Sequence, residues 1–251
     1  MPATMRALAL LLLMLLALLP LGAEEPPPEH PAPPPISVES ARLLELGKLL
    51  MGQNNPALAL EPERLPLEQR NAAADQALRT FKVVVKREPK LAEGWLWLGI
   101  ALTQTLRYSR EFPQGKPLRT EANINEGLQA FRTAYECAPA NEDCIKYYSD
   151  ALMEFRKDFQ TALTLWEKYL AAPEPRTDLQ KMIAQVQAAR ACLNKAYFGR
   201  EDKLPPDVIR KSYYDAVAYL QQASALFPAA NDVKEMQGLL LQYKQFILGK
   251  P

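Results

Sequence analysis

The sequence predicts an all-α protein built from repeated pairs of helices. Beyond residue 37 the good helix formers Ala, Leu, Gln, Glu, Lys and Arg dominate, and residues that favour strands are few. Apolar side chains recur there at spacings of three and four, as they do along one face of a helix. One such pattern occurs four times along the chain, which indicates a repeat array.

The pattern that occurs four times combines a small residue, a large residue four positions later, an apolar residue three positions further on, and a closing Pro. These offsets place the side chains on one helical face, and Pro ends the helix because it lacks a backbone donor. The copies are Ala77, Phe81, Val84, Pro89; Gly127, Phe131, Ala134, Pro139; Ala162, Trp166, Tyr169, Pro173; and Ala216, Leu220, Ala223, Pro228.

A second helical pattern accompanies each copy of the first, so that the predicted unit is an antiparallel pair of helices. Its copies are Leu43, Leu46, Gly47, Leu50; Trp95, Leu98, Gly99, Leu102; Ile145, Tyr148, Ser149, Leu152; and Leu179, Met182, Ile183, Val186. After the fourth pair, one more amphipathic segment predicts a capping helix with a polar outer face. Its apolar residues are Val233, Met236, Leu240, Tyr243 and Ile247.

These patterns resemble the tetratricopeptide repeat family over roughly residues 37–249. The join between the first two units matches best, and it consists of Ala77, Phe81, Val84 and Pro89 followed by Trp95, Leu98 and Gly99. The resemblance implies an α-solenoid of about four helix pairs plus a C-terminal cap, wound into a right-handed superhelix. It implies binding of proteins or peptides, although a repeat fold alone defines no specific activity.

The units are longer than the family's repeat of about 34 residues. Their terminal prolines are spaced by 50, 34 and 55 residues. We place the extra residues between the two helices of a pair, at roughly 52–69, 104–120 and 197–207. Part of each insertion is expected to lengthen a helix, and the rest to form loops on one edge of the stack.

The second insertion is rich in basic and aromatic residues. It contains Arg107, Arg110, Lys116 and Arg119, together with Tyr108 and Phe112. Contact with an acidic partner or with membrane head groups is one interpretation of this composition. A solvated loop with no binding role is the other.

The N-terminal 23 residues have the order of a secretory signal peptide. Arg6 is the only charge, an apolar run follows over residues 7–19, and small residues near Ala23 precede two glutamates. The run is shorter than the ~20 residues of a membrane span. We therefore predict export, to the periplasm or outside the cell, with a membrane tether through residues 7–23 as the alternative. Residues 24–36 form a Pro-rich linker, and residues 37–251 form the repeat domain.

The inventory of reactive side chains does not favour catalysis. The only histidine, His30, lies in the linker, so no histidine-based catalytic or metal site is expected, and the cysteines lack metal-binding spacing. The formal net charge of +1 gives no excess of basic residues for binding the phosphates of nucleic acid. We expect no enzyme activity, cofactor, metal or nucleic-acid partner.

The three cysteines leave one alternative open. Cys137 and Cys144 flank the turn at Pro139, which could bring them within disulfide range, and two packed thiols are the alternative that the sequence favours. Cys192 lies in an apolar helical stretch and is expected in the core.

The candidate binding residues follow from the resemblance, because the first helices of this family line a concave groove. The corresponding positions are Leu44, Lys48, Leu96, Ile100, Lys146 and Asp150. An apolar centre flanked by charges is typical of an interface. Alternatively, the second insertion covers Leu96 and Ile100. Some members of this family use polar groups in the groove to bind the terminal carboxylate of a peptide. In this sequence Leu44 and Leu96 occupy such positions, so binding of a terminal carboxylate is not expected.

The predicted function is therefore that of an exported scaffold or adaptor that binds a protein or peptide in this groove or along the inserted loops. The alternative is a self-associating structural subunit of an envelope assembly.

Overall fold

The computed structural model describes residues 36–55, 57, 66–109 and 111–249. The predicted signal peptide, all of the linker before Ile36, Arg110 and half of the first insertion lie outside these residues. Within the described part, no helix combines the length and apolar character that a membrane crossing needs.

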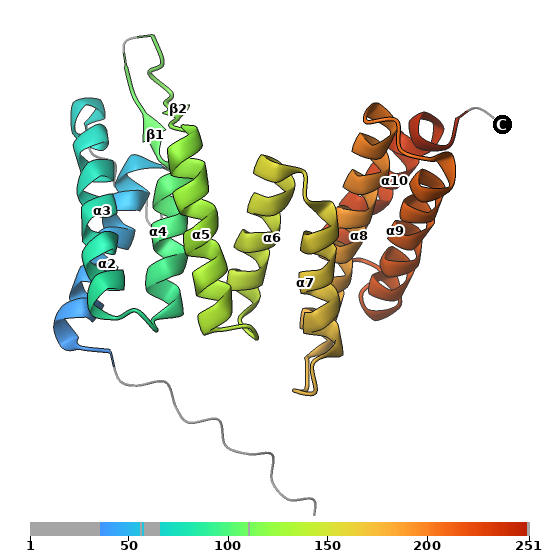
Figure 1. The fold of residues 1–251 in the computed structure, drawn as a ribbon, viewed down its shortest axis with the longest axis horizontal. Helices are drawn as coiled ribbons and strands as arrows, with labels where there is room; N and C mark the ends of the chain where they lie inside the picture. The colour runs from blue at the N-terminus through green and yellow to red at the C-terminus, as the bar shows by residue number, and fades with distance from the viewer. Residues whose placement is uncertain (1–35, 56, 58–65, 110, 250–251) are drawn as a thin grey trace, which may run out of the picture. The chain divides into compact units, whose positions relative to one another are not determined.

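The predicted helix pairs are all present in the described residues (Figure 1). They are α2 (Val38–Asn54) with α3 (Leu67–Arg87), α4 (Ala92–Gln104) with α5 (Glu121–Cys137), α6 (Glu142–Arg156) with α7 (Phe159–Ala171), and α8 (Asp178–Glu201) with α9 (Pro206–Leu226). The predicted cap is α10 (Asn231–Leu248), which packs on α8 and α9. Each helix also contacts the next one along the chain, and the first helices of successive pairs contact one another. This is an α-solenoid of four helix pairs and a capping helix.

Each of the first three pairs places a small residue of its first helix against a large aromatic residue of its second. The pairs are Gly47 with Phe81, Gly99 with Phe131, and Ser149 with Trp166. A Cβ atom at Gly99 would lie 2.5 Å from the Phe131 ring, so only glycine allows this approach. In the third pair the contact is polar, because Trp166 Nε1 donates a hydrogen bond to Ser149 Oγ over 3.0 Å. The repeated small residue of the sequence therefore sets how closely two helices pack.

Local sequence explains where the helices begin and end. A side-chain oxygen of the residue before the helix accepts a backbone N–H of the first turn in five cases. These residues are Ser37, Thr120, Asn141, Asp158 and Thr177. The prolines that close the repeated pattern follow within two residues of the end of α3, α5, α7 and α9.

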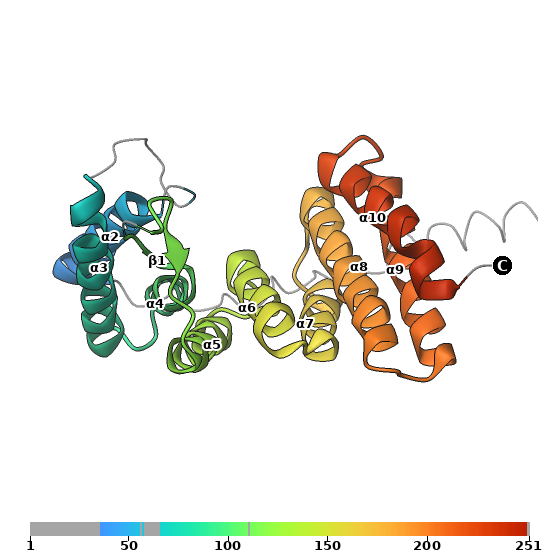
Figure 2. The same cartoon turned by 90° about the horizontal axis from the view of Figure 1, so that it is seen from above.

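Two apolar clusters form the core, and α6 contributes to both. Cys144 and Ala151 face the cluster built on α2 to α5, whereas Ile145 and Leu152 face the cluster built on α7 to α10. Adjacent residues of a helix lie about 100° apart around its axis, so one helix can supply both faces. Figure 2 shows α6 between the two sets of helices.

The insertions differ in structure. The second was expected to be partly helix and partly loop, but it lengthens neither α4 nor α5. It forms a short antiparallel hairpin, β1 (Leu106–Arg107) with β2 (Lys116–Pro117). The third is mostly helical, because α8 extends to Glu201 and α9 begins at Pro206. The hairpin leaves the stack at the end where α4 turns towards α5 (Figure 1).

Candidate functional site

Three of the predicted groove residues are part of the core. Leu44, Leu96 and Ile100 are only 3%, 8% and 1% exposed, and they belong to the apolar cluster around Phe81 and Phe131. Because their side chains are enclosed by neighbouring helices, they do not line an accessible groove, which corrects the prediction for these three residues. The residues that pack with Leu96 and Ile100 in this cluster come from the helices and not from the second insertion, which the alternative named as their cover.

The fourth predicted residue, Lys48, is engaged in ion pairs. Its ammonium group lies 2.7 Å from Glu45 Oε1 and also contacts Glu93 Oε1, which comes from the first helix of the next pair. Burial acts to lower the pKa of Lys48, but the hydrogen bonds that Lys48 donates to Glu45 and Glu93 outweigh it, and the pKa is raised. Lys48 therefore stays charged and links α2 to α4.

The last two predicted residues, Lys146 and Asp150, line a cleft of about 350 Å³. They form an ion pair over 2.9 Å on α6, and both side chains are partly exposed. The opposite wall comes from the end of α4 and from the hairpin. The other lining residues are Asn55, Thr103, Gln104, Leu106, Pro117, Arg119, Phe131, Tyr147, Ala151, Glu154 and Phe155. We call this the hairpin cleft.

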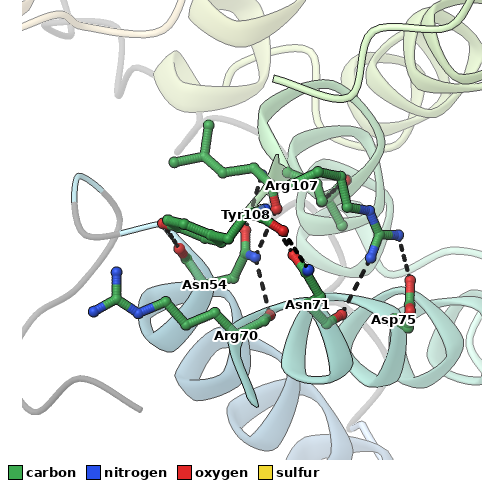
Figure 3. Close-up of polar contacts among 9 residues, drawn as sticks. Asn54, Arg70, Asn71, Asp75, Arg107 and Tyr108 are labelled. Atoms are coloured by element: carbon green, nitrogen blue, oxygen red, sulfur yellow. Dashed lines mark hydrogen bonds and ion pairs between the residues drawn. The ribbon is translucent and has the colours of Figure 1, made fainter. Parts of the chain in front are cut away.

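Two asparagines of the first helix pair hold the hairpin in place (Figure 3). The amide of Asn54 donates to Leu106 O and accepts from Leu106 N, over 2.9 and 3.0 Å. Asn71 makes the same two bonds to the backbone of Tyr108, each over 2.9 Å. Each amide thus pairs with the strand as a neighbouring peptide group would. A second bond from Asn54 Nδ2 to Arg70 O, over 3.0 Å, ties α2 to the start of α3.

Side chains of the hairpin reinforce this attachment. The Tyr108 hydroxyl donates to Asn54 O, and Arg70 lies over the Tyr108 ring at 5.1 Å. Arg107 forms an ion pair with Asp75 and donates to Asn71 O over 3.2 Å. The hairpin is therefore a fixed part of the domain, joined to a helix pair that precedes it in the chain.

The basic residues of the second insertion do not form an open positive patch in the described structure. Arg107 and Arg119 are paired with Asp75 and Glu154, and Lys116 lies over the Phe112 ring at 5.0 Å. Arg110, the fourth basic residue of the prediction, lies outside the described residues.

Both charged groups and aromatic rings line the hairpin cleft. Arg119 Nη1 lies 2.6 Å from Glu154 Oε1 and joins the hairpin to α6. The guanidinium of Arg119 also lies 5.2 Å from the centre of the Phe155 ring, and the ammonium of Lys146 lies 5.2 Å from that of Tyr147. Such a surface offers both apolar contact and hydrogen bonds to a bound chain.

The cysteines are free thiols in this structure. Cys137 is exposed, with its sulfur 3.8 Å from Pro89 O, whereas Cys144 is buried in the core. The two thiols thus have different surroundings, and the disulfide that their spacing allows is not formed here. Cys192 is buried, as expected. Among the described residues, no cluster of His, Cys, Asp and Glu side chains has an arrangement that could hold a metal ion.

The packing of the described residues defines a helical-repeat protein of the α-solenoid class. No family model matches the chain, and no curated protein matches it. A solved structure described as "MamA RS-1 ArsTM double mutant" is similar at 13% identity and a TM-score of 0.46, over 86% of this chain and 100% of that one. Neither value assigns this chain to a family.

Proposed function

We propose that this chain is a protein-interaction scaffold and that the hairpin cleft is its binding site for an extended peptide segment of a partner. The observation that carries the proposal is the construction of the cleft. One wall is a hairpin fixed by two buried or half-buried asparagines, and the other is the helix α6 with its exposed charges and rings.

A preformed cleft favours binding because little conformational entropy is lost when the partner arrives. The Asn54 and Asn71 bonds already order the hairpin wall, and the Arg119–Glu154 ion pair joins the two walls. The cleft is too small to enclose a folded domain, but it fits several side chains of a peptide. Lys146 and Asp150, which line this cleft, are two of the six residues that the sequence predicted for a groove.

A charge-exchange variant tests the proposal directly. A peptide display library is screened against the full chain, and the affinity of the enriched peptides is measured by calorimetry. In the double variant Lys146→Asp/Asp150→Lys the ion pair on α6 is kept, but its direction is reversed. We expect the enriched peptides to bind this variant about tenfold more weakly or worse, because charged partner groups meet the wrong sign.

The matched control is the double variant Lys211→Asp/Asp215→Lys. Lys211 and Asp215 form a similar ion pair over 2.7 Å, four residues apart on α9 and away from the hairpin cleft. This variant should bind the peptides as the unchanged chain does. Equal affinity for both variants, or no enrichment of any peptide, would contradict the proposal.

We also propose that the chain is exported by its first 23 residues. Support comes from the sequence alone, in the order of a charge, an apolar run and small residues before Glu24. N-terminal sequencing of protein from the envelope and the medium should find cleavage after Ala23. Uncut chain in the membrane fraction would favour the tether through residues 7–23, and uncut chain in the cytosol would contradict export.

Self-association is a second candidate, favoured by apolar side chains on the first and last described helices. Leu49 on α2 is 61% exposed and Leu241 on α10 is 73% exposed. Light scattering over a range of concentrations separates the two functions. A monomer at all concentrations contradicts self-association and leaves the scaffold function.

A further inference from the structure

A second cavity lies beside the turn that joins α7 to α8. Its volume is about 440 Å³, and pockets that bind small ligands measure roughly 300–1,000 Å³. This turn joins the second helix of one pair to the first helix of the next, whereas the hairpin joins the two helices of one pair. The turn and the hairpin therefore lie at opposite ends of the helices (Figure 1). The polar residues that line the cavity are Glu174, Arg176, Lys181, Gln185 and Gln222.

Arg176 is the most unusual of these residues, because its side chain is only 9% exposed yet poorly paired. Its Nε atom has no hydrogen-bond partner in the described structure. Its contact with a carboxylate is a single approach of Nη2 to Glu174 Oε2 at 3.5 Å, the outer limit of a hydrogen bond. A guanidinium has five N–H donors, and buried ones are normally satisfied.

The Tyr169 ring supports the guanidinium from one side. The Arg176 Cζ atom lies 4.3 Å from the centre of that ring, which holds the group in place without using its donors. The Tyr169 hydroxyl is itself buried and without a partner in the described structure. Burial, together with the nearby Glu142 carboxylate, raises the pKa of Tyr169, so the hydroxyl keeps its proton and remains a donor. The Arg176 Nε–H and the Tyr169 hydroxyl are therefore adjacent buried donors, and each lacks an oxygen acceptor.

The residues that line the cavity carry more positive than negative charge. Arg176 and Lys181 provide two positive charges, against one carboxylate from Glu174. Lys181 also lies 3.3 Å from Asp178, outside the cavity lining, and is half-exposed. Gln185 Nε2 donates a hydrogen bond to Gln222 Oε1 over 3.3 Å, and the buried Gln185 Oε1 has no donor in the described structure.

We propose that this cavity binds an oxyanion, and that Arg176 is the residue that receives it. A carboxylate suits the site best, because its two oxygens match the paired N–H groups of a guanidinium. The carboxylate can belong to a small acid or to an acidic side chain of a bound protein, and inorganic phosphate has related chemistry. This site is independent of the hairpin cleft and of the partner proposed there.

Titration of the full chain with succinate tests the proposal. Chloride keeps the ionic strength constant, and binding is followed by calorimetry and by the NMR signals of the Arg176 Nε–H and the backbone amides of residues 176–181. We expect saturable binding that shifts these signals. Arg176→Gln should weaken the affinity about tenfold or more, because a charge-assisted hydrogen-bonded pair is lost.

Two further variants separate binding from folding. Arg210→Gln removes an exposed arginine on α9 that does not line the cavity, and it should bind succinate as the unchanged chain does. Arg176→Lys keeps the charge but not the planar group, so its affinity should fall between those of the unchanged chain and Arg176→Gln. If Arg176→Gln lowers the melting temperature, the affinity of Arg176→Lys for succinate is compared with that of the unchanged chain instead.

Two other probes identify the source of the anion. The first is a capped peptide with one Glu, compared with the same peptide carrying Gln, and the second is inorganic phosphate. Binding of the Glu peptide indicates a protein side chain, binding of succinate alone indicates a small acid, and binding of phosphate alone indicates a phosphate-bearing ligand. The proposal is overturned if none of the probes binds saturably, or if Arg176→Gln and Arg210→Gln bind them equally well.

Discussion

The side chain of Asn54 is hydrogen-bonded to both backbone groups of Leu106, which lies 52 residues further along the chain. Asn54 is fully buried, whereas Leu106 is half-buried. The last residue of α2 thereby fixes the first residue of the hairpin. Since the hairpin forms one wall of the cleft, the geometry of the proposed binding site depends on a residue of the preceding helix pair.

Replacing Asn54 with Ala should destabilise the domain and loosen the hairpin. The change leaves the N–H and C=O of the half-buried Leu106, and also Arg70 O, without these partners. We expect a loss of about 1–3 kcal/mol in the free energy of unfolding. Denaturant unfolding measures this loss. Hydrogen exchange at the Leu106 amide should accelerate more than exchange at core amides of α8.

The control for this prediction is Asn231→Ala, at an exposed position in the first turn of α10. A surface change of this kind should alter the unfolding free energy by about 0.5 kcal/mol or less. If Asn54→Ala were as mild as this control, the two backbone bonds would not hold the hairpin.

Replacing Gly99 with Ala should destabilise the second helix pair. The new Cβ would lie 2.5 Å from two atoms of the Phe131 ring, which is closer than carbon atoms pack. Helix propensity favours Ala by about 1 kcal/mol, but overpacking of a core costs about 1–3 kcal/mol. We expect a net loss of stability, measured as a lower melting temperature, and partial recovery when Phe131→Leu is added.

Gly238 provides the opposite case. It also lies within a helix, but a Cβ there would meet nothing within 4 Å. Gly238→Ala should therefore stabilise the protein by up to about 1 kcal/mol. Equal effects at Gly99 and Gly238 would show that helix packing is not limited by the small residue of the repeat.

The number, order and pairing of the helices could be predicted from the sequence because they depend on local patterns. Gly99 and Phe131 belong to patterns that recur, and each pattern shows which face of its helix is buried. Prolines and capping residues then indicate where the helices end. The right-handed winding of the stack stays a prediction from the family resemblance.

The hairpin cleft could be predicted only in part, because it depends on contacts between distant segments. Lys146 and Asp150 were found from their positions on a first helix. Leu96 occupies a comparable position, but it is buried by neighbours that the spacing of residues does not reveal. The role of Asn54 gave no sequence signal, since an Asn at the end of a helix is common and its partner is 52 residues away.

Replacing Ser149 with Ala should weaken the third helix pair. Trp166 is fully buried, and its indole N–H would lose its acceptor. An unsatisfied buried donor costs about 1–3 kcal/mol. The double variant Ser149→Ala/Trp166→Phe removes both partners and tests for coupling. If its loss of stability equals the sum of the two single losses, the hydrogen bond contributes nothing of its own.

The three thiols should differ in their reactivity. Burial raises the pKa of both Cys144 and Cys192 to about 12, and both side chains are enclosed by the core. Partial burial and the nearby Glu136 carboxylate also raise the pKa of Cys137, but its thiol is exposed. Since the thiolate is the reactive form, a disulfide reagent at about pH 8 should modify Cys137 first and the other two only after unfolding. Denatured protein prepared without reductant should give three thiols. Fewer than three would show that a disulfide has formed, in contrast to the free thiols of this structure.

The same two buried thiols should make stability depend on pH in the alkaline range. In the folded state they stay protonated up to about pH 12, whereas in the unfolded chain they ionise above their ordinary pKa of 9.0. Between these values the unfolded state binds fewer protons, so the free energy of unfolding falls as the pH rises. The double variant Cys144→Ala/Cys192→Ala lacks this contribution. Its stability should fall less between about pH 8 and about pH 10.5 than that of the unchanged chain, and parallel curves from denaturant unfolding would show that burial does not hold these thiols neutral.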